Sequence, residues 1–492
     1  IGDKLVKIFQ KMKKVCKWVF VTAVSLCCVA LLAFLAALET PPASTIDNLY
    51  EIPPPDSVVL VEFTKLKNCS SDIDHYAQIY RDFAYWIKTG SISSAVFDKV
   101  LKKGNMHLNG GETLFITYYP LNASLHGYDT RGTTGPWGLD GINRIWDPVA
   151  QFLKTASNKS FTAMVSSMDY PRFVTADTPK SSLYTYLWPE SYTNSKDMFD
   201  RISYFRDRYN SSLPFNQSDY LTYTAGGRSM LQLHGYFQND NTLFIKNIEA
   251  PIFSHCKVEN YLDMVLPLWY HVSSSAGTHD PVPWEKKKNV VFWRGATTGG
   301  DPVSKKPWRQ YHRLRLIEWA RKYALVNPDN IFDAGEDGAQ IPNPNGLSVD
   351  VGIHKIHNAD KTTAKVIAKT YGIKKSVNIE KILEFKYLIV VDGHTWPSRL
   401  LDYLQTNSVI LFNGIFTDYF SWMLEPFVHY VPFKSDYSDL EERLQWLMNH
   451  DADAQRISMN ARNLLERIHT IEHMQCYTGL AMLEYSNLFV QG

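Results

Sequence analysis

The fold is decided by two stretches of one pattern in the second half of the chain, residues 289–300 (NVVFWRGATTGG) and 387–397 (YLIVVDGHTWP). Each stretch opens with a short apolar run, 289–293 or 387–391, in which Asn289 is the one polar residue, then enters a glycine-containing loop and is followed by a helical pattern of apolar residues. Short apolar runs bounded by such loops predict buried strands. The apolar runs 408–412 and 428–433 predict two further strands. Strands that alternate with helices predict a parallel sheet covered on both faces, so the expected fold class is α/β.

Both loops carry groups that suit an anion. In an open parallel sheet the ligand crevice lies at the carboxyl ends of the strands, and Arg294 and Arg399 follow the two strands there. Backbone N–H groups of residues 295–300, and of a helix that starts near Ser398, can donate to phosphate oxygens, and a guanidinium can bind two such oxygens. A diphosphate suits this combination of backbone N–H groups and guanidinium groups. The alternative is that the loops are plain turns and the arginines form surface pairs, since the chain has neither a P-loop nor a GxGxxG motif.

A carboxylate near the end of an earlier strand is a second candidate group. Asp169 follows the apolar run 161–167 and precedes Tyr170 and Pro171, which end a strand and hold the side chain at its tip. An aspartate in this position is suited to act as a general base. An ordinary turn has the same pattern, and the residues alone leave both interpretations open.

Composition indicates a folded globular protein. The 492 residues are 45% hydrophobic and 21% charged, which excludes disordered and fibrous classes. The length predicts two lobes rather than one core. Nucleic acid is excluded as a partner because 51 Lys and Arg against 50 Asp and Glu leave no broad basic field.

The N-terminal end predicts a membrane anchor. Residues 1–17 hold six lysines and one aspartate, and residues 18–38 form an uncharged apolar run. As a helix this run spans roughly 31 Å, enough to cross a bilayer. Because positive charge keeps the first end cytosolic, we expect a single-pass type II protein whose remainder lies in the lumen of the Golgi or the endoplasmic reticulum. Residues 39–55 are proline-rich and predict a stem. Cleavage after the apolar run is the alternative.

An ordered series of motifs resembles one known family. The series comprises Asp169-Tyr170-Pro171, residues 283–288 (PWEKKK) leading into Phe292-Trp293-Arg294-Gly295, Asp392-Gly393 before Ser398-Arg399, and residues 424–432 (LEPFVHYVP). In these motifs the chain is similar to the lumenal glycosyltransferases of glycosyltransferase family 90, which include protein O-glucosyltransferases and fungal capsule-associated xylosyltransferases. The resemblance extends from about residue 160 to residue 490.

The resemblance implies a GT-B-like fold, in which two Rossmann-like lobes face each other across a cleft. Residues 56–270 would form the acceptor-side lobe with the catalytic base, and residues 271–470 the lobe that binds the nucleotide sugar. Residues 471–492 would form a C-terminal helix that packs back on the first lobe.

The resemblance also implies roles for individual residues. Asp169 would take the proton from an acceptor hydroxyl, while Arg294 and Arg399 neutralise the departing UDP. Cys69 and Cys476 would form a disulfide, as in relatives. No metal or other cofactor is implied. The residues expected to bind the nucleotide sugar are Arg294, Gly295, Thr297, Thr298, Asp392, Gly393, Ser398 and Arg399.

The segment after Arg294-Gly295 leaves the donor sugar open. Protein O-glucosyltransferases typically have Ser-Arg-Thr-Ser there, whereas this chain has residues 296–299 (ATTG), which look more like the fungal and capsule branch. The expected activity is therefore inverting transfer of xylose or glucose from a UDP-sugar to a hydroxyl of a glycan or protein. The alternative is a catalytically inactive lumenal carbohydrate-binding protein of the same fold. A glycoside hydrolase would need a second carboxylate facing the first.

Several patterns that could hold a metal are more typical of structural roles. Each lacks a complete ligand set or has the position of a helix cap or a solvated loop. They are the H-x-x-E-H series at 469–473, the pair His354 and His357, the Asp-x-Asp pairs at 72–74 and 451–453, and the acidic loop at 333–337.

Overall fold

The computed structural model of this protein describes residues 69, 76–97, 113–120, 124–129, 139–157, 159–166, 251–258, 263–268, 271–272, 279–324, 348–414, 416–434 and 436–490. The chain divides into two units, residues 1–51 and 52–492, and every described residue lies in the second. The predicted cytosolic tail (1–17), anchor (18–38) and stem (39–55) lie outside the described residues. Among the helices that are described, none is long and apolar enough to span a bilayer.

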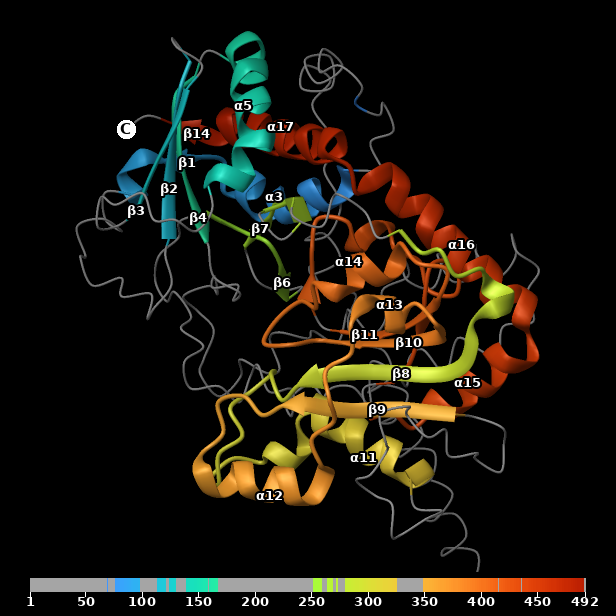
Figure 1. Ribbon diagram of the computed structural model, residues 1–492. Helices are drawn as coiled ribbons and strands as arrows, with labels where there is room; N and C mark the ends of the chain where they lie inside the picture. Colours follow the sequence, from blue (N-terminus) through green and yellow to red (C-terminus); the bar gives the residue numbers. More distant parts are fainter. Residues whose placement is uncertain are drawn as a thin grey trace, which may run out of the picture. The chain divides into compact units, whose positions relative to one another are not determined.

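The C-terminal sheet is parallel throughout, in the strand order β13-β11-β10-β8-β9 (Figure 1). Each of the four apolar runs singled out in the sequence overlaps one of its strands, so the prediction of a parallel α/β sheet is confirmed here. The strands are β8 Lys288–Ala296, β9 Ser348–Lys355, β10 Phe385–Val391, β11 Val409–Asn413 and β13 Val431–Pro432. The helices are α11 His312–Ala324, α12 Lys361–Tyr371, α13 Ile379–Ile382, α14 Arg399–Leu404, α15 Leu440–Asn449 and α16 Asp451–Ile468.

Alternate residues of the central strands face two different cores, because successive side chains of a strand point to opposite faces. On one face, Phe292 of β8 belongs to a buried cluster with residues of α14 and α16. On the other face, Trp293 of β8 packs in a cluster with residues of α11, α12 and α15. β10 is buried along its whole length, as expected for a strand covered by helices on both sides.

The N-terminal sheet is mixed, with the order β3-β2-β4-β5-β7. Strand β2 runs antiparallel to β3 and β4, whereas β4, β5 and β7 are parallel. The Rossmann-like lobe that the resemblance implies for this part therefore stays a prediction, since the sheet is only partly parallel. The connection from β2 to β3 is only a few residues long, which permits a hairpin but no parallel crossover. The strands are β2 Thr113–Tyr119, β3 Ser124–Asp129, β4 Phe161–Ser166, β5 Ile252–Ser254 and β7 Met264–Val265.

The C-terminal helix α17, Ile471–Leu488, is tied to the N-terminal sheet. The Tyr485 hydroxyl donates to the carbonyl oxygen of Thr162 in β4 at 2.8 Å. A disulfide joins Cys69 to Cys476 of α17, with a Cα–Cα distance of 5.6 Å, and this is the pair that the resemblance implies. The end of the chain is thereby linked covalently to a residue that precedes the first sheet. Other elements of this part are α3 Ala77–Thr89, α5 Leu139–Ala156, β1 Ile92–Ser93 and β14 Phe489–Val490.

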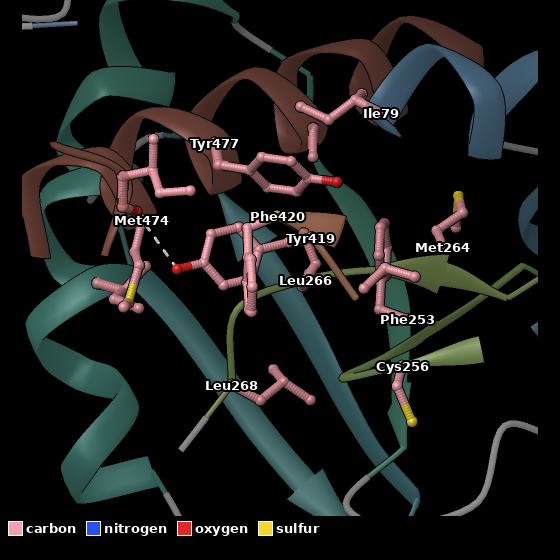
Figure 2. Close-up of a cluster of buried hydrophobic side chains, with 14 of the residues drawn as sticks. Ile79, Phe253, Cys256, Met264, Leu266, Leu268, Tyr419, Phe420, Met474 and Tyr477 are labelled. Atoms are coloured by element: carbon pink, nitrogen blue, oxygen red, sulfur yellow. Dashed lines mark hydrogen bonds between the residues drawn. The ribbon is translucent and has the colours of Figure 1, made fainter. Parts of the chain in front are cut away.

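The segment after β11 enters the same core as the N-terminal sheet. Strand β12, Phe416–Thr417, pairs antiparallel with β6, Lys257–Val258. Figure 2 shows Tyr419, which follows β12, among buried side chains that include Phe253 of β5 and Tyr477 of α17. Residues of both sheets therefore contribute to one continuous buried cluster.

The disulfide closes a loop of 407 residues, and its loss should destabilise the fold. We expect Cys69→Ser to cost about 2–5 kcal/mol of unfolding free energy, because the open chain regains conformational entropy when it unfolds. Thermal unfolding of the variant, measured beside the wild-type protein with and without reductant, checks this. The reduced wild-type protein should unfold like the variant, and equal unfolding of the variant and the oxidised wild type would contradict the expectation.

Candidate functional site

The strand order of the C-terminal sheet contains a switch point between β8 and β10. Counted along the chain from β8, the order is 2-1-3-4-5, so the chain continues to β9 on one side of β8 and later to β10 on the other. Ligands of open α/β sheets bind outside the carboxyl ends of the strands at such a point. Residues 297–300 leave β8 there and residues 392–397 leave β10. The structure thus brings the two predicted loops, and with them Arg294 and Gly295 at the end of β8, to one edge of the sheet.

Arg399 contacts the end of β8 directly. It is the first residue of α14, it is partly exposed, and its Nη1 donates to the backbone carbonyl oxygen of Arg294 at 2.5 Å. The start of α14 and the end of β8 are therefore adjacent in space although 105 positions separate them in the sequence. This proximity is what a phosphate clamp built from both loops requires.

The guanidinium of Arg294 is engaged with β9. Its Nη2 donates to Oδ1 of Asp350 at 2.7 Å, and Nζ of Lys374 donates to the same oxygen at 2.7 Å. Burial alone would raise the pKa of Asp350, but Lys374 and Arg294 outweigh it and lower this pKa. Arg294 is 8% exposed. The structure therefore shows this guanidinium in an ion pair with the partly exposed Asp350 carboxylate, and its expected contact with a ligand stays a prediction.

Arg313 of α11 holds the two loops together, and the sequence did not single it out. Its Nε donates to the carbonyl oxygen of Asp392 at 2.6 Å, and its Nη1 donates to the carbonyl oxygen of Ala296 at 3.0 Å and to Oγ1 of Thr298 at 2.5 Å. Burial is the main cause that lowers the pKa of Arg313, and the nearby Arg399 guanidinium lowers it further. Two cations thus lie close together at the switch point, where a bound anion would reduce their repulsion.

The glycine turn after β8 is required by its geometry. Gly299 and Gly300 have φ angles of 96° and 127°, which favour glycine. A Cβ on Gly299 would lie 2.6 Å from the carbonyl oxygen of Gly393 and would overlap the imidazole of His312. The turn therefore packs directly against the 392–397 loop, and no side chain fits between the two backbones.

The other predicted residues lie at the same edge. Oγ1 of Thr297 accepts a hydrogen bond from the backbone N–H of His357 at 2.8 Å. Asp392 is buried, and its carbonyl oxygen also accepts a hydrogen bond from Nε2 of His312 at 2.8 Å. Ser398 is the exposed residue before α14, and its side chain makes no capping hydrogen bond. The structure therefore collects all eight predicted nucleotide-sugar residues around the ends of β8 and β10.

Asp169 cannot be placed relative to this edge, because it lies outside the described residues. The strand expected before it is present as β4, which ends at Ser166. The assignment of Asp169 as a general base stays a prediction.

The rival metal patterns have structural contacts where they are described. His469 lies with Nδ1 3.2 Å from the Tyr419 hydroxyl, and Asp451 accepts hydrogen bonds from Trp284 and Lys386. Within the described part of the chain, no group of three or more His, Cys, Asp or Glu side chains is placed to hold a metal ion. The remaining acidic candidates, residues 72–74 and 333–337, lie outside that part.

Known proteins with similar sequences include O-glucosyltransferases and viral proteins. Residues 345–491 match the model of glycosyl transferase family 90. The chain is 28% identical over 260 residues to protein O-glucosyltransferase 2 of Danio rerio, a match that covers 49% of this chain and 44% of the relative. It is 25% identical over 437 residues to the uncharacterized protein 179R of Invertebrate iridescent virus 6, covering 73% of this chain and 34% of the relative. It is 24% identical over 258 residues to protein O-glucosyltransferase 1 of Rattus norvegicus, covering 48% and 57%.

The matched relatives are spanned only in part, by about half of their length or less. The family match begins just before β9 and continues through α17, so it includes Asp392, Gly393, Ser398 and Arg399 of the site. Through residues 345–491, the chain is similar to glycosyl transferase family 90.

Proposed function

We propose that this protein is an inverting glycosyltransferase that moves xylose or glucose from a UDP-sugar to a hydroxyl group of a glycan or a protein. The family match and the O-glucosyltransferase relatives support sugar transfer. The finer proposal depends chiefly on one observation, which is that Arg313 and Arg399 meet two tightly packed loops at the switch point of the sheet. Backbone N–H groups and guanidinium groups in such a position suit a pyrophosphate.

The proposed reaction is one displacement at the anomeric carbon of the donor sugar. The acceptor oxygen forms the new bond to this carbon as the bond to the β-phosphate oxygen breaks, so the anomeric configuration inverts. Asp169 takes the hydroxyl proton, and the negative charge that leaves with UDP is stabilised by the arginine side chains at the switch point. Preorganised cations act most strongly where charge develops in the transition state.

The proposal extends to the setting of the reaction. We place the catalytic part in the lumen of the Golgi or endoplasmic reticulum, anchored through residues 18–38, because lysines precede that apolar run. We also propose that the two sheets belong to two facing lobes of a GT-B fold, and that transfer needs no metal because the arginines neutralise the leaving group.

Binding of nucleotide sugars is the first test of the proposal. Thermal shift of the full chain with UDP-xylose, UDP-glucose, UDP-galactose and GDP-mannose should show stabilisation by a UDP-sugar. UDP release in the presence of a chelator should follow with a panel of glycan and serine-peptide acceptors. Binding of glycans with no UDP release would favour the inactive carbohydrate-binding protein, and complete dependence on added Mn²⁺ would refute the metal-free mechanism.

Gly299→Ala should weaken UDP binding by about tenfold or more, because a Cβ in this left-handed conformation pushes the two loops apart. Isothermal titration with UDP measures the effect. Gly90→Ala is the matched control, since Gly90 also has a positive φ of 91° but a Cβ there meets nothing within 4 Å. The control should lose some stability and keep its UDP affinity. Equal UDP affinity of the two variants would contradict the proposed role of the glycine turn.

A further inference from the structure

Two histidines meet above the carboxyl end of β8. His357 follows β9 and His394 follows β10, and these strands flank β8 on either side. Nε2 of His394 lies 3.3 Å from Nδ1 of His357, and their ring centroids are 5.0 Å apart. The pair therefore spans the switch point at which the diphosphate is proposed to bind.

The hydrogen bonds of His394 define its protonation state. The backbone N–H of Gly299 donates to Nδ1 of His394 at 3.4 Å, and an amide N–H can only donate. Nδ1 must therefore carry no proton, which places the single proton of the neutral ring on Nε2. That proton is donated to Nδ1 of His357. His394 is thus a neutral imidazole whose Nδ1 accepts the Gly299 N–H.

The surroundings of His394 keep the ring neutral. Burial is the main cause that lowers the pKa of His394, to about 4, and His357 and Arg313 add to the effect while Asp301 opposes it. His312 of α11 packs against the same glycine turn. His354 of β9 is the remaining histidine at this edge, and burial together with Arg399, Arg294, Arg313 and Lys355 lowers its pKa as well.

We propose that the pair formed by His357 and His394 takes up one proton from solvent when the diphosphate of the nucleotide sugar binds, and that this protonation releases the Gly299 N–H to the phosphate. The inference depends on the proposed nucleotide site. A phosphate group brings negative charge to a ring that lies near the Arg313 guanidinium, and opposite charge favours the protonated imidazole. A proton on Nδ1 turns this nitrogen from an acceptor into a donor, so the ring and the freed amide both face the anion with donors.

The direction of the pH dependence follows from linkage. Because the complex holds the proton more tightly than the free protein, affinity for UDP is highest at low pH. It should fall by up to about tenfold per pH unit once the pH exceeds the pKa of His394 in the free protein, and level off above the pKa in the complex.

Isothermal titration of the full chain with UDP tests the inference. Titrations at one mildly acidic pH in PIPES and in imidazole buffer, whose ionisation heats differ, give the number of protons taken up. His394→Asn keeps an acceptor for the Gly299 N–H and cannot titrate, so it should take up fewer protons than the wild type and lose the extra pH dependence. His357→Asn should reduce the uptake as well. His279→Asn changes an exposed histidine and should behave like the wild type.

The outcomes separate the two proposals. UDP itself can take up protons, and this contribution is the same for all variants. The test therefore depends on the difference in proton uptake between each variant and the wild type. Equal proton uptake by the wild type and His394→Asn would overturn the inference while leaving the nucleotide site in place. Loss of proton uptake in His354→Asn, with uptake retained in His394→Asn, would overturn it as well. Absence of any UDP binding to the wild type would overturn the nucleotide site and the inference together.

Discussion

Asp169→Asn should lower the rate of sugar transfer by about 10²–10⁴-fold, the range typical for loss of a general base. Asparagine keeps the shape of aspartate but cannot accept the proton of the acceptor hydroxyl. Affinity for UDP should stay within about twofold, because a base that acts on the acceptor makes no contact that holds the nucleotide. UDP release with acceptor present measures the first quantity, and isothermal titration with UDP measures the second.

The control for this substitution is Asp147→Asn on the exposed surface of α5. It removes the same charge from the chain and should leave both quantities at wild-type values. Wild-type turnover of Asp169→Asn would remove the base assignment. A parallel loss of transfer and UDP affinity would instead place Asp169 in the donor site.

Arg399→Ala should lower the rate of transfer by about 10²–10³-fold, the loss found when a donor that stabilises developing negative charge is removed. The side chain reaches the end of β8, where its Nη1 donates to the carbonyl oxygen of Arg294. UDP affinity should fall too, because in the proposed site the guanidinium would contact the phosphates before and after transfer. Rates of UDP release and titration with UDP give both values.

Arg399→Lys separates charge from geometry. It retains the positive charge but loses the planar fork that binds two oxygens, so its activity should lie between those of the wild type and Arg399→Ala. Arg321→Ala, on the outer part of α11, is the matched control and should be neutral. Full activity of Arg399→Ala would show that Arg399 does not bind the phosphates of the donor.

Arg294 needs a different measurement from Arg399. Its buried guanidinium forms an ion pair with the partly exposed Asp350, so Arg294→Ala would change the charge balance around that carboxylate and Lys374. Removing one partner of a pair that is largely shielded from water is destabilising. Stability must therefore be measured beside activity before a loss of transfer by this variant is assigned to the reaction.

The parallel sheet could be predicted because its evidence is local. Residues 290–293 and 387–391 are apolar without interruption, and such strands require cover on both faces. The structure buries them in this way, with Phe292 and Trp293 in two different cores. That Arg294 and Arg399 lie at the same edge of the sheet was also predictable, since carboxyl ends of neighbouring parallel strands share one edge.

The N-terminal sheet and the inner parts of the site were less accessible to sequence reasoning. Antiparallel pairing of β2 depends on the short connection to β3, whose flanking residues show no distinct alternation. Arg313 lies in α11 between His312 and Leu314, and its sequence position looks like that of any residue in an amphipathic helix. Its hydrogen bonds reach Ala296 and Asp392, which lie 17 and 79 positions away in the sequence. No local sequence pattern predicts contacts between residues so far apart.

By itself, the sequence determined the parallel α/β class of the C-terminal part, the two loops with their arginines and the similarity to a glycosyltransferase family. Apolar periodicity, glycine turns and motif order are properties of neighbouring residues, so they can be read without coordinates. Only the tertiary structure decided which contacts form at the switch point. Arg399 donates a hydrogen bond to the end of β8, Arg294 pairs with Asp350, and His357 contacts His394. These contacts depend on the order in which strands enter the sheet, and that order is set by the packing of the whole chain rather than by any local pattern.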